Sequence, residues 1–71
     1  MLKNHDYNLI ETITIISKSL YRYDQYMQDL DKEKCESCRR IWTQFKEHRE
    51  KELKMLVQEL KNHVEMGMFN E

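Results

Sequence analysis

The sequence predicts an all-α protein, an antiparallel two-helix hairpin that dimerises into a four-helix bundle. The 71-residue chain contains no proline and a single glycine, Gly67, while residues with a strong helical preference are plentiful. Two segments carry apolar residues at steps of three and four, as on one face of a helix. The segment between them, residues 31–34, is entirely charged, so it is the expected bend of a single domain spanning residues 1–71.

The first helix is expected over about residues 5–30. Asn4 or Asp6 can accept the free amide hydrogens of its first turn. Its apolar residues form one heptad-like stripe: Leu9, Ile13, Ile16, Leu20, Tyr23, Met27 and Leu30.

The second helix is expected over about residues 35–66. Its stripe contains Cys38, Trp42, Phe45, Leu53, Leu56, Leu60 and Val64. Gly67 suits a left-handed helix end, closed by an apolar contact from Met68 or Phe69. Folding the chain about Lys32 or Glu33 places Tyr23 opposite Trp42, so the two stripes face each other.

Apolar residues outside these stripes predict a second contact surface. A chain of this length buries only about 60% of its unfolded surface, so a lone hairpin is marginal, and pairing of two hairpins is the economical solution. We therefore expect a homodimer, open to a further protein partner. The residues expected to form the interface are Ile10, Ile15, Tyr21, Tyr26, Ile41 and Met55.

The charge pattern disfavours two classes of partner. Twelve Lys and Arg residues stand against thirteen Asp and Glu residues, interspersed throughout, so no basic surface for nucleic acid is expected. The longest apolar run, residues 55–57, is far below the ~20 residues of a membrane span, and no membrane association is expected. The start of the chain has no apolar signal region, which favours a cytoplasmic protein.

Cys35 and Cys38 form a CxxC motif at the expected start of the second helix, and three interpretations stay open. The spacing is half of a tetrahedral zinc site. A helix N-terminus also lowers the pKa of a thiol, which favours redox chemistry. Alternatively, Cys38 packs as a small apolar residue while Cys35 stays partly exposed.

A second group of metal-ligating side chains is expected at the open end of the hairpin. His5, Asp6, Glu59 and His63 approach one another there, and Glu59 and His63 are four residues apart, a spacing that can chelate a divalent metal. Solvated ion pairs are the competing interpretation.

Four stretches carry a resemblance to known proteins: SLYRYDQYMQDL (19–30), CESC (35–38), IW (41–42) and NHVEMGMF (62–69). In this pattern the chain resembles small uncharacterised bacterial two-helix proteins with a CxxC near the bend. More weakly, it is similar to half-length ferritin-like proteins, which pair hairpins into a four-helix bundle. The chain lacks the Glu-x-x-His motif of that family, because Leu2, Phe45 and Leu60 precede its histidines by three residues.

These observations favour a non-enzymatic interaction or assembly module that acts as a homodimer without a cofactor. The alternative is a metal-binding module for zinc or iron, or a thiol-redox module, that uses Cys35 and Cys38.

Overall fold

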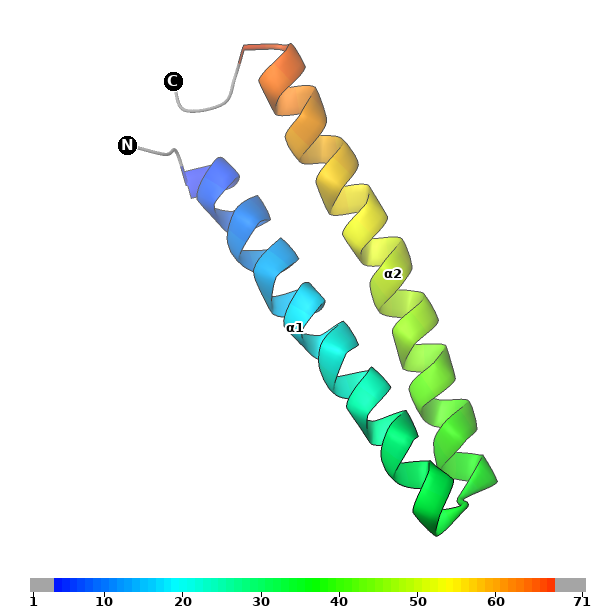
Figure 1. Cartoon of the computed structure of the whole chain (residues 1–71). Helices are drawn as coiled ribbons and strands as arrows, with labels where there is room; N and C mark the ends of the chain where they lie inside the picture. Colours follow the sequence, from blue (N-terminus) through cyan, green and yellow to red (C-terminus); the bar gives the residue numbers. More distant parts are fainter. Residues whose placement is uncertain (1–3, 68–71) are drawn as a thin grey trace.

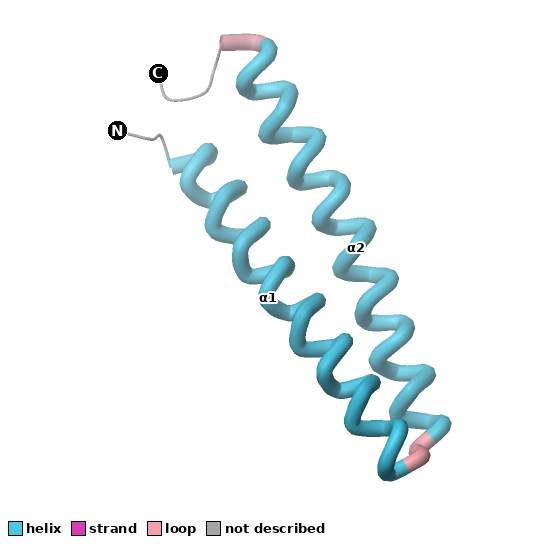
Figure 2. The backbone as a smooth tube through the Cα atoms, viewed as in Figure 1, coloured by secondary structure: helices cyan, strands magenta, loops and turns pink. Residues whose placement is uncertain are grey.

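Two long antiparallel helices make up the part of the chain that the structure describes. The computed structural model describes residues 4–67, with α1 spanning Asn4–Glu33 and α2 spanning Glu36–Glu65. The helices lie side by side along their length (Figure 1), and the rod measures 50 × 18 × 13 Å. Figure 2 shows loop only at the bend and after α2, so the expected all-α hairpin is confirmed.

The seam between the helices follows the predicted stripes. Tyr23 and Trp42 stack with ring centroids 5.9 Å apart, as their expected opposition requires. Phe45 meets both rings edge-on, and Tyr26 lies 5.0 Å from Trp42. Aromatic packing therefore holds together the half of the hairpin nearer the bend.

Burial along this seam is shallow. Ile16 and Leu30 are the only apolar side chains among residues 4–67 that are buried, and the other seam residues keep part of their surface in water. Helices of this length usually gain their stability from packing an apolar face. The hairpin has only one helix to cover each such face.

The bend is shorter than the sequence predicts. We expected a bend over residues 31–34, but α1 continues to Glu33 and only Lys34 and Cys35 lie between the helices. The charged residues of this segment are good helix formers and need no apolar partner to stay helical. The helix ends where the backbone reverses, at Lys34, with a φ of 51°.

The end of α2 agrees with the prediction. Gly67 has a φ of 69°, and its amide donates to the carbonyl of Val64 at 3.2 Å. Met66 is the C-cap, and its amide donates to Asn62 at 2.9 Å. The expected apolar contact from Met68 or Phe69 lies outside the described residues. Neither helix has a stretch long and apolar enough to cross a membrane, as far as residues 4–67 are concerned.

The left-handed backbone at Lys34 gives a prediction about stability. A side chain at positive φ costs about 1 kcal/mol that glycine avoids, so Lys34→Gly should raise the free energy of unfolding by about that amount. Lys32→Gly is the matched control inside α1, and it should lower this free energy by about 1 kcal/mol. Urea unfolding at one fixed protein concentration measures both. Equal destabilisation by the two variants would contradict the conformation of the bend.

Candidate functional site

The structure gathers the candidate residues into two groups at opposite ends of the rod. His5, Asp6 and His63 meet at the open end, where α1 begins and α2 ends. Cys35 and Cys38 meet at the bend. The two groups differ in chemistry, because one combines imidazoles with carboxylates and the other is a pair of thiols.

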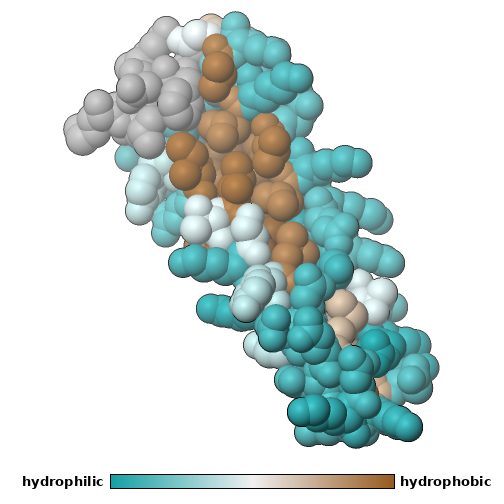
Figure 3. Space-filling view, in the orientation of Figure 1, coloured by the Kyte–Doolittle hydropathy of each residue, from teal (hydrophilic) through white to brown (hydrophobic). Residues whose placement is uncertain are grey.

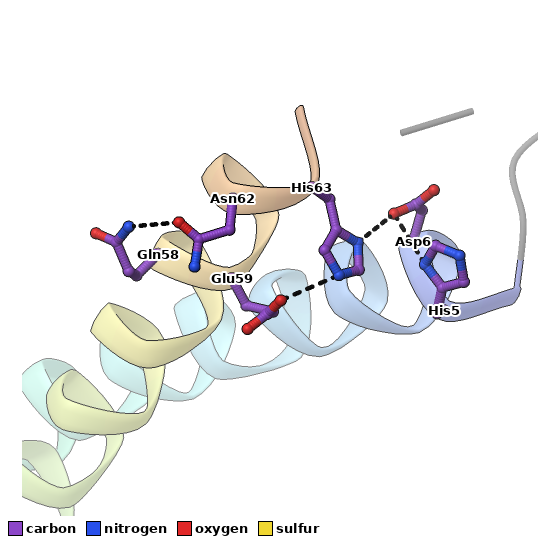
Figure 4. A network of polar contacts seen from close by, with 6 residues as sticks. All are labelled: His5, Asp6, Gln58, Glu59, Asn62 and His63. Atoms are coloured by element: carbon purple, nitrogen blue, oxygen red, sulfur yellow. Dashed lines mark hydrogen bonds and ion pairs between the residues drawn. The ribbon is translucent and has the colours of Figure 1, made fainter. Parts of the chain in front are cut away.

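The open-end group is built around a buried carboxylate. Asp6, in the first turn of α1, has no exposed surface, and its Oδ1 lies 2.8 Å from Nδ1 of His63 in α2. The same oxygen lies 3.1 Å from Nδ1 of His5. Figure 4 shows both rings directed at this carboxylate, and their centroids are 4.9 Å apart in an edge-on arrangement.

Glu59 contacts the other side of the His63 ring. Its Oε1 lies 3.1 Å from Nε2 of His63, so the imidazole is held between two carboxylates (Figure 4). The side chain of His63 is only 11% exposed, whereas those of His5 and Glu59 are about half exposed. The sequence predicted that these four residues approach one another, and the structure brings them together. The antiparallel helices place the start of α1 beside the end of α2, and the spacing of four residues places Glu59 beside His63.

With these contacts, the open-end group can either form hydrogen bonds between the two helices or bind a metal ion. A histidine with a carboxylate at each nitrogen can donate two hydrogen bonds when both ring nitrogens are protonated. It can also release the Nδ1 proton and bind a metal ion there. Within residues 4–67, His5, Asp6 and His63 are the only group of three potential metal ligands whose atoms lie within 4.8 Å of one another.

The thiol pair begins α2. Cys35 is the N-cap, and its Sγ accepts a hydrogen bond from the amide of Cys38 at 3.3 Å. The two sulfur atoms lie 2.6 Å apart, and the hydroxyl of Ser37 is 3.3 Å from Cys35 Sγ. Both cysteines are free thiols and half-buried.

This arrangement separates the acidities of the two thiols. A hydrogen bond from Cys38, followed by one from Ser37 and one from the amide of Cys38, lowers the pKa of Cys35 to about 7. The pKa of Cys38 is raised, first because its hydrogen bond to Cys35 favours the thiol and then by desolvation. Cys35 is therefore the thiolate of the pair near neutral pH.

Two features of this site were missing from the sequence-based prediction. The first is that Cys35 itself caps α2, whereas Asp31, in the charged segment before it, pairs with Arg39 at 3.5 Å. Ser37 was not assigned to the site. Its position two residues after the cap is the signal that was available, because a hydroxyl in a first helical turn can reach the capping atom.

The expected interface residues retain accessible surface. Ile15, Tyr21, Tyr26, Ile41 and Met55 are exposed, and Ile10 is half-buried. They do not share one face. Ile10 and Tyr21 are about three turns apart on one side of α1, and helical periodicity puts Ile15 and Tyr26 on the other side.

Comparisons of the chain with protein-family models, with curated proteins and with solved structures found no match. The contacts and charges of the hairpin itself are therefore the guide to its function.

The thiol geometry predicts a pH profile of reactivity. Alkylation of Cys35 should reach half of its maximal rate near pH 7, because only the thiolate attacks. Cys38→Ala should move this midpoint to higher pH, since it removes the largest cause of the lowered pKa while keeping the amide donor.

Ser37→Ala is the matched control and should give a smaller upward shift, since its hydrogen bond is the second cause. Mass spectrometry of iodoacetamide-treated protein measures the rate at each pH. A midpoint for Cys35 that is unchanged in Cys38→Ala would contradict the assigned hydrogen bond.

Proposed function

We propose that the chain is a homodimeric assembly module whose apolar faces pair two hairpins into a four-helix bundle. The observation that carries this proposal is that many large apolar side chains of the hairpin are exposed to solvent. Ten large apolar or aromatic side chains among residues 4–67 are exposed, whereas two are buried. Contiguous apolar surface on a small domain commonly marks a protein contact.

One face of the hairpin offers the larger continuous surface. Figure 3 shows apolar side chains gathered over the open-end half of both helices. Helical periodicity and partial exposure identify its members, here termed the open-half patch: Ile10, Ile13, Leu53, Val57, Leu60 and Val64.

A cross-helix ion pair supports placing the two halves of this patch on one side. Asp24 lies about four turns after Ile10 on α1, and Lys46 lies about three turns before Val57 on α2. Lys46 Nζ donates to Asp24 Oδ1 at 2.9 Å, and this contact raises the pKa of Lys46. Asp24 is on the same side of α1 as Ile10, and Lys46 is on the same side of α2 as Val57. Ile10 and Val57 therefore flank the seam on the same side of the hairpin.

A second copy of the chain is the simplest partner for the open-half patch. Two such patches facing each other under two-fold symmetry bury leucine, isoleucine and valine against the same residue types. The shallow seam of each hairpin then becomes the interior of a bundle. This accounts for a 71-residue chain without a disulfide between its helices.

Introducing a charge into the open-half patch tests this proposal. Val57→Glu, in the open-half patch, should weaken dimerisation by about tenfold or more, because a carboxylate would be buried without a partner. Met55→Glu is the matched control, since Met55 is 72% exposed and lies on the opposite side of α2. Sedimentation at micromolar concentration measures both, with helical content checked by circular dichroism.

A wild-type chain that sediments as a monomer at these concentrations would contradict the assembly module. Dissociation by Met55→Glu with a dimeric Val57→Glu would move the interface to the other face, which carries Ile15 and Ile41.

The second candidate function is dithiol–disulfide exchange at the bend, which the separated acidities of the thiols favour. The Cys35 thiolate would attack a partner disulfide, form a mixed disulfide and release one partner thiolate. The Cys38 thiol, as its proton leaves, would then attack Cys35 and release the second partner thiolate. The partner disulfide is reduced to a dithiol as the pair is oxidised.

Glutathione provides a direct test of this exchange. In a glutathione redox buffer the wild type should pass from the dithiol to a Cys35–Cys38 disulfide, because the resolving thiol is in contact. Cys38→Ser should instead accumulate the mixed disulfide at Cys35. Mass spectrometry after acid quenching distinguishes the two products, and equal accumulation of mixed disulfide in both proteins would exclude the exchange reaction.

A further inference from the structure

The open-end group has the composition and spacing of a metal site. We propose that His5, Asp6 and His63 bind a divalent transition metal of the zinc class, with Glu59 as a positioning residue for the His63 ring. This goes beyond assembly and beyond the thiols, because neither uses any of these residues. The observation behind it is a fully buried carboxylate with one oxygen directed at two imidazoles.

The ligand set selects the type of ion. Two imidazole nitrogens and one carboxylate oxygen suit Zn²⁺, Co²⁺ or Ni²⁺, whereas Mg²⁺ and Ca²⁺ prefer a shell of oxygen atoms. Three protein ligands also leave a fourth position of a tetrahedron for water or an outside ligand. His5 is 44% exposed at its side chain, which gives the ion a route from solvent.

Two of the three distances between ligand atoms, those from Asp6 to each imidazole, are close to those of a tetrahedral shell. Ligands about 2.0–2.1 Å from zinc are about 3.3 Å apart. The contacts of Asp6 Oδ1 with the Nδ1 atoms of His63 and His5 are 2.8 and 3.1 Å. The three ligand atoms lie within 4.8 Å of one another, so binding of the ion requires the two Asp6 contacts to widen by a few tenths of an ångström and the two imidazole nitrogens to move closer together.

Glu59 prepares the imidazole of His63 for this role. A ligating histidine usually donates its other N–H to a carboxylate, which fixes the tautomer and the ring orientation. Glu59 Oε1 already lies 3.1 Å from Nε2, which leaves Nδ1 directed at Asp6.

The position of the site gives metal binding a structural effect. His5 and Asp6 belong to the first turn of α1, whereas His63 belongs to the last turn of α2. An ion bound by all three residues joins the two helix ends that are farthest from the bend. Because the unfolded chain does not hold these ligands together, metal binding should stabilise the hairpin.

Zinc titration in a background without thiols tests the site. Cys35→Ser/Cys38→Ser removes the competing thiolates, and serine at position 35 remains a good N-cap. This protein, stripped by a chelator, should bind one Zn²⁺ per chain by calorimetry and native mass spectrometry. Its melting temperature should rise with added zinc.

Single substitutions in that background locate the ligands. His63→Gln and His5→Gln should each weaken zinc binding by at least about tenfold, and Glu59→Gln by about tenfold. His48→Gln, at an exposed position in the middle of α2, is the matched control and should bind as the parent does. If His63→Gln fails to fold, the exposed His5 still supplies the test.

The metal site would be overturned by no binding in the thiol-free background, by parental affinity in both His5→Gln and His63→Gln, or by equal loss in His48→Gln. One Zn²⁺ per two chains would also overturn it, because a single chain supplies all three ligands. Val57→Glu separates this inference from assembly, since it should lose dimerisation and still bind one ion per chain.

Discussion

Two packed helices can cover only one stripe of each other, and this limit governs the rest of the hairpin. The seam from Leu9 to Leu30 meets its counterpart on α2, but side chains next to the seam have no third helix above them. Tyr23 and Trp42 stack across the seam, yet both retain accessible surface. The two-helix architecture therefore leaves apolar side chains accessible to solvent on either side of the seam.

The two polar groups lie where the apolar seam ends. At the open end, Asp6 is buried and its carboxylate contacts His63 of α2, so the helix ends are joined by a polar contact instead of an apolar one. At the bend, the turn is so short that Cys35 has to serve as the cap of α2. Because the chain reverses within two residues, the sulfur of Cys35 lies at the N-terminus of α2.

Periodicity made most of the fold predictable, and it also predicted that the open-end residues approach one another. The stripes around Tyr23 and Trp42, and the helix end at Gly67, follow from residue spacing alone. The left-handed conformation of Lys34 could not be foreseen, because it depends on where the backbone must reverse and not on the preference of lysine. The roles of Cys35 as cap and of Ser37 as its neighbour depend in turn on that reversal.

The length of the rod has a consequence for communication between its ends. The hairpin extends 50 Å, and the thiol pair and the imidazole group lie at opposite ends of it. Mobile ions screen exposed charges over a Debye length of about 8 Å at physiological ionic strength. A change of charge at one end is therefore not felt electrostatically at the other. Only a mechanical signal, such as a rotation of one helix against its neighbour along the seam, can link the two ends.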